Sequence, residues 1–155
     1  MEDFSFYPRY QKHIARRILA VDFGSKVIGT AMFCPGIDPF PYVAEKIIYK
    51  SDAEAVKSLK QIVENEGIDI IVLGIPYFLD GGESENTKRM KTFGELLKAH
   101  CPEQEFYEQD ETLTTVAAED RMKSSPQFNF KVDVTKIDCI AETIILEDFI
   151  RMEKF

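Results

Sequence analysis

The sequence predicts an α/β domain built on a mixed five-stranded sheet. Three strand-like runs, residues 17–21, 29–33 and 42–50, follow one another without a helical pattern between them, which is typical of an antiparallel meander. Two later runs, 68–76 and 105–110, each come after a helical pattern, which is typical of parallel strands joined by crossover helices. We therefore expect an antiparallel three-strand meander extended by parallel strands and flanked by helices.

The composition is that of a folded domain with an acidic surface. The chain has 155 residues, of which 45% are hydrophobic and 30% charged, and its formal net charge is −8 at pH 7. Contacts to phosphate need Lys or Arg, so this charge argues against a general polyanion binder. Local basic surfaces remain compatible with the sequence, because cations cluster near the N-terminus and on one later segment: Arg9, Lys12, Arg16 and Arg17, then Lys88, Arg89, Lys91 and Lys98.

Membrane and export functions are not expected. No uncharged run approaches the roughly 18 residues that a bilayer span needs, and no apolar secretory segment opens the chain. Cys34, Cys101 and Cys139 are far apart and odd in number, so neither a disulfide framework nor a zinc site is indicated. These features are typical of a protein of the reducing cytoplasm.

The first half of the chain should supply the meander and one helix. Residues 1–16 mix aromatic and basic side chains without clear periodicity, so we expect an N-terminal extension to a single domain over 17–155. The stretch "GSKVIG" has glycines at both ends and should connect the first two strands. Ser51 and Glu54 have capping-box spacing before an apolar stripe that stops at Gly67, which predicts a helix.

The second half should alternate strands and helices. Residues 68–76 are continuously apolar, as in a strand covered on both faces. A polar loop then leads to a helix with an inner stripe of Met90, Phe93, Leu96 and Leu97, followed by the strand 105–110 and a helix over 113–123. After an irregular segment, the last helix should begin with Thr135 as N-cap and Asp138 at its third position.

Carboxylates from distant segments should meet in this topology. Asp22 closes the first and central strand, Asp110 and Glu111 close the fifth, and Asp138 begins a helix that packs beside the sheet. Carboxylates that lie close together repel unless they share a proton or bind a cation. Magnesium prefers oxygen ligands, and a pair of ions about 4 Å apart supports in-line phosphodiester cleavage. The pattern therefore predicts a metal-dependent nuclease site without histidine.

Four motifs in order carry a family resemblance. The stretches "LAVDFGSKVIGTA", "IVLGIPYFLDGG", "QDETLTT" and "IDCIAETIILEDFI" resemble the YqgF/RuvX family over roughly residues 17–152. The resemblance implies a ribonuclease H-like fold, a bacterial cytoplasmic location and an endonuclease that processes the 5′ end of pre-16S rRNA. An older label for the family implies a Holliday junction resolvase acting on branched DNA.

The resemblance also implies roles for individual residues. Asp22, Glu111 and Asp138 become the catalytic residues and the ligands of two Mg²⁺ or Mn²⁺ ions. The resemblance does not settle whether Glu111 or its neighbour Asp110 is the ligand. Adjacent strand residues face opposite ways, so one of the two is expected to enter the site; Glu111 is our choice and Asp110 the alternative. Asp138 has a competing role in the capping box with Thr135. The expected substrate contacts come from the strand connections, a turn at 74–76 and the start of a helix: Gly24, Lys26, Pro76, Asp80, Gly81, Thr114 and Thr115.

Three departures from the family pattern fall within the expected site. Val27 and Thr112 stand where family members usually carry arginine, and Glu142 adds a carboxylate one helical turn after Asp138. One interpretation is an active nuclease in which Glu142 joins the metal ligands. The other is an RNA-binding or ribosome-binding module with an impaired site. Both remain open at the level of sequence.

Partners follow from these alternatives. We expect a nucleic acid, either pre-rRNA or branched DNA, with ribosomal particles as a further partner and no membrane. A resolvase would be a homodimer because two strands must be cut symmetrically, whereas processing of one RNA strand suits a monomer as well. Sugar kinases and actin-type ATPases share the sheet, but those chains are longer and enclose a nucleotide between two domains, so that function is not favoured.

Overall fold

The computed structural model describes residues 3–23, 26–111, 114–128, 130–132 and 137–151, without the side chains of 114–116, 128 and 137–139. The elements in chain order are a 3-10 turn η1 (Phe4–Phe6), α1 (Pro8–Lys12), β1 (Ile18–Phe23), β2 (Val27–Phe33), β3 (Tyr42–Ile48), α2 (Asp52–Glu66), β4 (Ile70–Ile75), α3 (Glu85–His100), β5 (Glu105–Asp110), α4 (Thr114–Lys123), a second 3-10 turn η2 (Pro126–Phe128) and α5 (Ile137–Arg151).

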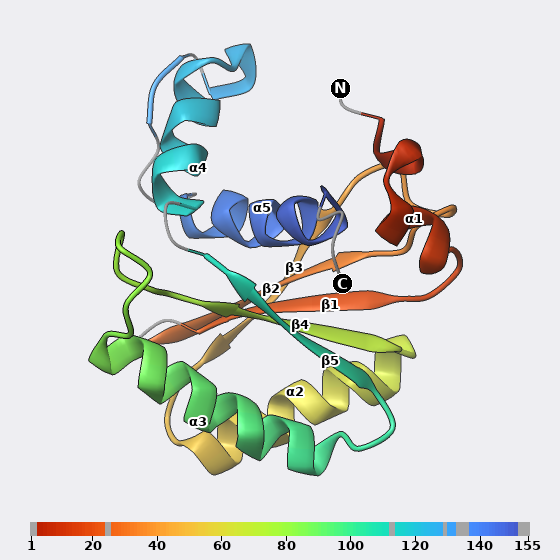
Figure 1. Ribbon diagram of the computed structural model, residues 1–155, viewed down its shortest axis with the longest axis vertical. Helices are drawn as coiled ribbons and strands as arrows, with labels where there is room; N and C mark the ends of the chain where they lie inside the picture. The colour runs from red at the N-terminus through yellow and green to blue at the C-terminus, as the bar shows by residue number, and fades with distance from the viewer. Residues whose placement is uncertain (1–2, 24–25, 112–113, 129, 133–136, 152–155) are drawn as a thin grey trace.

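The five strands form one mixed sheet in the order β3-β2-β1-β4-β5, which confirms the predicted meander and parallel extension. Strands β1 and β2 pair antiparallel, as do β2 and β3. Strand β4 pairs parallel with both β1 and β5. Strand β1 is therefore central, and its carboxyl end shares one edge of the sheet with those of β4 and β5 (Figure 1).

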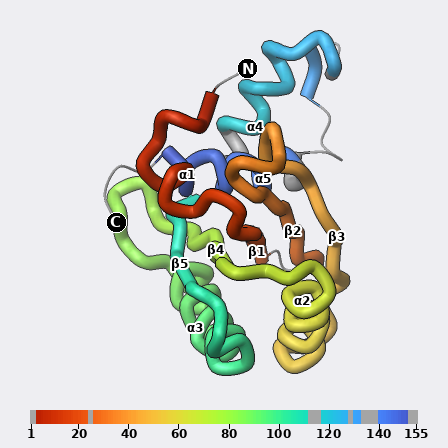
Figure 2. Tube along the Cα trace, turned by 90° about the vertical axis from the view of Figure 1, so that its right-hand side faces the viewer, coloured from red at the N-terminus to blue at the C-terminus, as the bar shows by residue number. Residues whose placement is uncertain are grey.

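Helices cover both faces of the sheet. Helices α2 and α3 lie side by side on one face, and α5 lies across the other (Figures 1 and 2). Alternation along β1 divides its side chains between these layers. Leu19 and Val21 pack in the core under α2 and α3, whereas Ile18 and Ala20 pack with residues of α5. By this alternation Asp22 belongs to the α5 face. None of the described helices combines the length and apolar character that a membrane span requires.

Local capping explains where the two long helices begin. The Ser51 hydroxyl accepts from the Glu54 N–H at 3.2 Å, as predicted, and Gly67 ends α2 in the left-handed conformation with φ of +63°. Helix α3 begins with a reciprocal capping box between Ser84 and Thr87, and the Thr87 hydroxyl also bonds to the carbonyl of Pro76. This last bond ties the start of α3 to the loop that follows β4.

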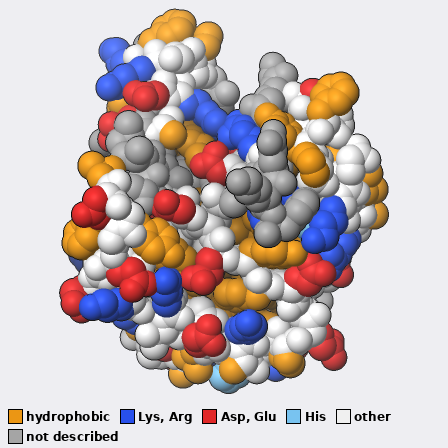
Figure 3. Space-filling view, in the orientation of Figure 1, with side chains coloured by type: hydrophobic (Ala, Val, Ile, Leu, Met, Phe, Trp, Pro, Cys, Tyr) orange, Lys and Arg blue, Asp and Glu red, His pale blue; other side chains and the backbone are white. Residues whose placement is uncertain are grey.

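Three basic residues near the start of α3 are engaged in ion pairs. Arg89 donates to Asp52 at 2.6 Å, with its guanidinium also over the ring of Phe23. Lys91 donates to Glu83 at 2.5 Å, and Lys88 lies 3.9 Å from Glu85. On the face shown in Figure 3, basic and acidic side chains are interspersed. Three of the four cations of the basic segment that the sequence allowed are therefore paired with neighbouring carboxylates, and the fourth, Lys98, is exposed further along the helix.

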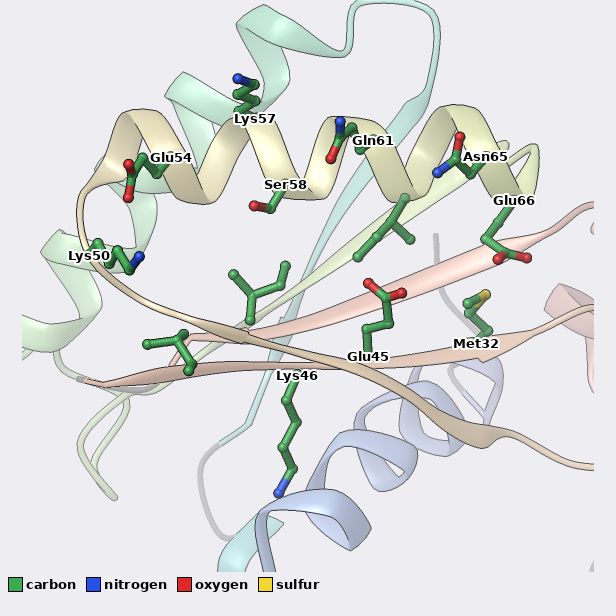
Figure 4. Close-up of a pocket in the computed structure, with 13 residues that line it drawn as sticks. Met32, Glu45, Lys46, Lys50, Glu54, Lys57, Ser58, Gln61, Asn65 and Glu66 are labelled. Atoms are coloured by element: carbon green, nitrogen blue, oxygen red, sulfur yellow. The ribbon is translucent and has the colours of Figure 1, made fainter.

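A groove of about 760 Å³ runs between the outer strand β3 and α2 (Figure 4). Glu45 and Met32 point into it towards α2, whereas Lys46 points away towards α5. The β2–β3 pairing shifts between Gly29 and Ala31, which indicates a bulge. Bulges and charged side chains both disfavour addition of a further strand. The edge of the sheet is thus protected, and none of the predicted site residues lines this groove.

Residues 3–16, expected as an extension before the domain, pack against α5 and β5. Arg9 is buried, donates to the carbonyl of Phe149 at 3.2 Å and places its guanidinium 4.3 Å from the centre of the Phe149 ring. His13 is fully buried, with its ring stacked on Phe149 and edge-on to Tyr107. The segment therefore covers the C-terminal half of the helix that packs over the central strands.

His13 should make folding stability fall on acidification. Burial, with Arg16, Lys12 and Arg9 nearby, holds the pKa of His13 below its usual 6.5, so the unfolded chain takes up this proton first. The contribution is present above pH 6.5 and is lost as the pH falls, by at most about 1.4 kcal/mol per unit. We expect His13→Leu to flatten the slope of unfolding free energy between pH 7 and 5.5, measured with urea.

The matched control is His100→Gln, because His100 is the other histidine of the chain and is exposed on α3. Its substitution should leave the slope as in the parent protein. An unchanged slope in His13→Leu would show that this histidine titrates alike in the folded and unfolded chains.

Candidate active site

Asp22 lies near the carboxyl end of the central strand, on the face covered by α5. It pairs with Gly29 of β2, and residues directly opposite in an antiparallel pair point to the same face. On the other side, Gly74 of β4 comes one residue after the last β1–β4 pair, Val21–Leu73. The Asp22 side chain is therefore flanked on the neighbouring strands by two glycines, Gly29 and Gly74, which have no side chains.

Glu111 approaches Asp22 from the β5 side. Its N–H donates to the carbonyl of Ile75 at 3.0 Å, which fixes the chain where β5 ends. Its carboxyl group is hydrogen-bonded to that of Asp22. A Cβ added at Gly74 would lie 2.8 Å from Glu111 Oε2 and 2.8 Å from Ile145 Cδ1 of α5. The glycine thus leaves the space in which the Glu111 carboxylate sits.

Glu142 occupies the matching position on the β2 side. Its side chain projects from α5 onto Gly29, where an added Cβ would lie 1.4 Å from Glu142 Oε1. Glu142 is only 1% exposed. Since neighbouring strands lie about 4.8 Å apart, Glu142, Asp22 and Glu111 form a row of carboxylates across three strands. Glycines at both ends of this row let α5 and the β5 connection come close to the sheet.

The contact between like charges is strongly unfavourable in the ionised form. Burial, the Asp22 carboxylate and the nearby Asp110 raise the pKa of Glu111 to about 10. The two carboxyl groups therefore share a proton at neutral pH, and this proton forms the hydrogen bond between them. A divalent cation held by Asp22 and Glu111 would take the place of this proton, because it would stabilise both carboxylates in the charged form.

The donor chemistry fits a hard cation. The row offers oxygen ligands alone, which suit Mg²⁺ and Mn²⁺. Among the residues with described side chains, no three His, Cys, Asp or Glu converge on a single ion. Asp138 is the second residue of α5, one turn before Glu142, and its side chain lies outside the description. A complete set of ligands at this edge therefore depends on the start of α5.

The other predicted residues lie around the same edge of the sheet. Asp110 is exposed, and Lys26 is exposed before β2. Pro76 follows β4, and Asp80 accepts from the Gly82 N–H at 2.8 Å in a turn where Gly81 has a φ of +88°. Three further predicted site residues lie outside the part of the chain that the structure describes, namely Gly24 and the side chains of Thr114 and Thr115. The same holds for Thr112, which stands where the family pattern has arginine.

Two residues of this arrangement had no predicted role in shaping the site. The sequence places Gly29 at the start of the second strand, where the connection from the first strand ends, and Gly74 at the end of the fourth strand, in a turn at 74–76. Both glycines lie inside strands, since β2 begins at Val27 and β4 continues to Ile75, so the turn starts after Ile75. The signal was present in the sequence, because glycine inside a strand often marks a close approach by another group.

Comparisons with known proteins agree with the geometry. The family model described as "RuvX: Holliday junction resolvase" matches residues 16–152. A relative from Maridesulfovibrio salexigens, named "Putative pre-16S rRNA nuclease", is 33% identical over 136 residues, which cover 86% of this chain and 97% of the relative. A Thermus thermophilus relative of the same name is 31% identical over 134 residues, covering 86% and 96%.

Solved structures match the fold at low sequence identity. T. thermophilus RuvC in complex with a Holliday junction substrate gives a TM-score of 0.54 at 7% identity, covering 88% of this chain and 96% of that one. The yeast mitochondrial Holliday junction resolvase Ydc2 gives 0.55 at 11%, covering 92% and 82%. These matches confirm the ribonuclease H-like fold. With the family model matching nearly the whole described domain, the chain belongs to the RuvX family and is a phosphodiester hydrolase.

Proposed function

We propose that the chain is a divalent-metal-dependent endonuclease that processes the 5′ end of pre-16S rRNA. The observation that carries the proposal is the contact between Asp22 and Glu111, in which two carboxyl groups are held together at the edge of the sheet. The RNA substrate is supported by the names of relatives that match over most of their length.

Asp22 and Glu111, with Asp138 from α5, are the residues that would hold the metal. When bound, divalent ions supply an activated water and charge stabilisation at the leaving oxygen. The chain's own contribution is to hold the carboxylates in place before substrate arrives. Glu111 is fixed through its N–H bond to Ile75. Asp22 is fixed by its pairing with Gly29 of β2 and by the pairing of the preceding residue, Val21, with β4. Lys26 lies exposed at the same edge, where it can contact a phosphate.

Branched DNA is the second candidate substrate, favoured by the description of the matching family model as a Holliday junction resolvase. That function requires two sites acting on two strands, and therefore a homodimer. We place RNA first because cutting one strand needs only the single site described above. An impaired binding module is the third candidate, which the departures at Val27, Thr112 and Glu142 keep open.

Cleavage of structured RNA carrying the pre-16S 5′ leader tests the proposal. We expect Mg²⁺-dependent or Mn²⁺-dependent cutting that EDTA abolishes, and a fall of at least about 100-fold in rate for Asp22→Asn. Glu103→Gln is the matched control, since this carboxylate is exposed before β5, at the other end of that strand. Binding without cutting by both parent and Asp22→Asn would identify a module, and preferential cutting of a four-way DNA junction would favour the resolvase.

Without metal, Glu111 should make the protein less stable as the pH rises. Its folded-state pKa is raised above the ordinary 4.5, so its contribution is fully present below pH 4.5 and is lost as the pH rises towards about 10. Glu111→Gln should therefore gain stability over the parent between pH 5 and 9, by about 1 to 3 kcal/mol. Urea unfolding in EDTA at several pH values measures the free energy of unfolding, with Glu108→Gln as control. The prediction would be refuted if this free energy depended on pH in the same way in the parent and in Glu111→Gln.

Gly29 and Glu142 should behave as a coupled pair. A methyl group at position 29 overlaps Glu142 Oε1, so Gly29→Ala must push that carboxylate out of its buried place. We expect a loss of about 1 to 2 kcal/mol in unfolding free energy for Gly29→Ala, which Glu142→Ala relieves in the double variant by about 1 kcal/mol or more. Additive losses in denaturant titrations would mean that the two positions are not in contact.

A further inference from the structure

Two exposed apolar side chains stand in the loop that follows β4. Phe78 is 57% exposed and Leu79 is 81% exposed. Neighbouring Tyr77 is half-buried and packs against the core, so the loop turns outward only after it. Large apolar side chains that are exposed together beside an active site often contact a ligand.

The backbone of this loop is fixed by its own hydrogen bonds. The Phe78 N–H donates to the Gly82 carbonyl at 2.9 Å, and the Gly81 N–H donates to the Phe78 carbonyl at 2.8 Å. Gly81 has a φ of +88°, which side chains rarely allow, and a Cβ added at Gly82 would lie 3.7 Å from Phe78 Cδ2. The backbone that carries Phe78 is therefore held by a defined turn, and one edge of the exposed ring lies next to Gly82.

The loop begins at the carboxylate row. Ile75, whose carbonyl accepts from the Glu111 N–H, lies three residues before Phe78. Three residues of chain reach at most about 11 Å, so Phe78 lies within that distance of the end of β4. A substrate strand whose phosphate meets Asp22 and Glu111 would thus have a nearby base within reach of the Phe78 ring.

Ionic contacts on this side of the site are weak. The cations at the start of α3, which follows the loop, lie beside carboxylates, with Lys91 at 2.5 Å from Glu83, Arg89 at 2.6 Å from Asp52 and Lys88 at 3.9 Å from Glu85. The whole chain also carries a net charge of −8. Phosphate contacts therefore supply little affinity here, and contact with bases has to contribute more.

We propose that Phe78, with Leu79 beside it, is a stacking surface for an unpaired base of the substrate close to the scissile phosphate. This inference rests on the proposed nuclease function and adds a substrate class, namely RNA that is single-stranded next to the cleavage position. A base inside a duplex is already stacked and cannot use the ring. Loss of one base stacked on an aromatic side chain should therefore weaken binding by about 10-fold.

The test measures binding apart from cleavage. Full-length Asp22→Asn protein, with Mg²⁺, is titrated with an RNA hairpin that carries 2-aminopurine in an unpaired tail, and with a fully paired duplex. We expect stacking on Phe78 to quench the fluorescence of the tail. Phe78→Ala, added to this protein, should lose the quench and bind the tailed RNA about 10-fold more weakly, while Phe78→Tyr keeps both properties. Affinity for the duplex should change less than two-fold.

The matched control is Phe6→Ala, which removes an 85% exposed aromatic side chain from the N-terminal turn η1. Equal affinity and equal quenching with and without Phe78→Ala in the Asp22→Asn protein would overturn the inference. Failure of the Asp22→Asn protein to bind the tailed RNA would also overturn it. Equal weakening on tail and duplex would also overturn it, since stacking requires a free base. Cleavage assays on the otherwise unsubstituted chain judge the nuclease function separately, so either proposal can fail alone.

Discussion

The repulsion between two carboxylates at the end of the central strand is the constraint around which this molecule is arranged. Asp22 and Glu111 are in hydrogen-bonding contact, and burial together with the Asp22 carboxylate raises the pKa of Glu111, so joint ionisation of the two groups is unfavourable. Such a contact persists only because strand pairing on both sides of β1 and the β5 connection fix the backbone on which both groups stand. The stability of the buried sheet thus keeps the two carboxyl groups in contact, although their mutual repulsion favours separation.

Helix α5 is the second part of this arrangement. It packs on the sheet through Ile145, Leu146 and Phe149, and the same helix carries Glu142 onto Gly29. Further along, Arg9 and His13 fix its C-terminal half against the N-terminal segment. The position of the carboxylates relative to β1 and β2 therefore depends on contacts at both ends of one helix, including contacts far from the chemistry.

Much of this could be predicted from local pattern. The apolar run before Asp22 placed it at the end of a buried strand, and Ser51 and Gly67 marked the ends of α2, because caps and hydrophobic periodicity are encoded by neighbours in the chain. The packing of residues 3–16 could not be predicted. Helix α1 has five residues and no apolar stripe, and the segment is anchored by two buried polar residues, Arg9 in the helix and His13 directly after it. The contact of Glu142 with Gly29 joins distant positions and needs the three-dimensional fold.

The charge of the site limits how substrate can be held. Glu142 adds a carboxylate to this edge, and the cations at the start of α3 are already paired with carboxylates. A phosphodiester can approach such an edge only when divalent ions offset the carboxylates, so substrate affinity and metal affinity should be linked. Contacts with the bases, which are not ionic, then determine which segment of the nucleic-acid strand binds at the site. Such a site favours particular structures in a nucleic acid over length of backbone, because the cations at the start of α3 are paired with carboxylates.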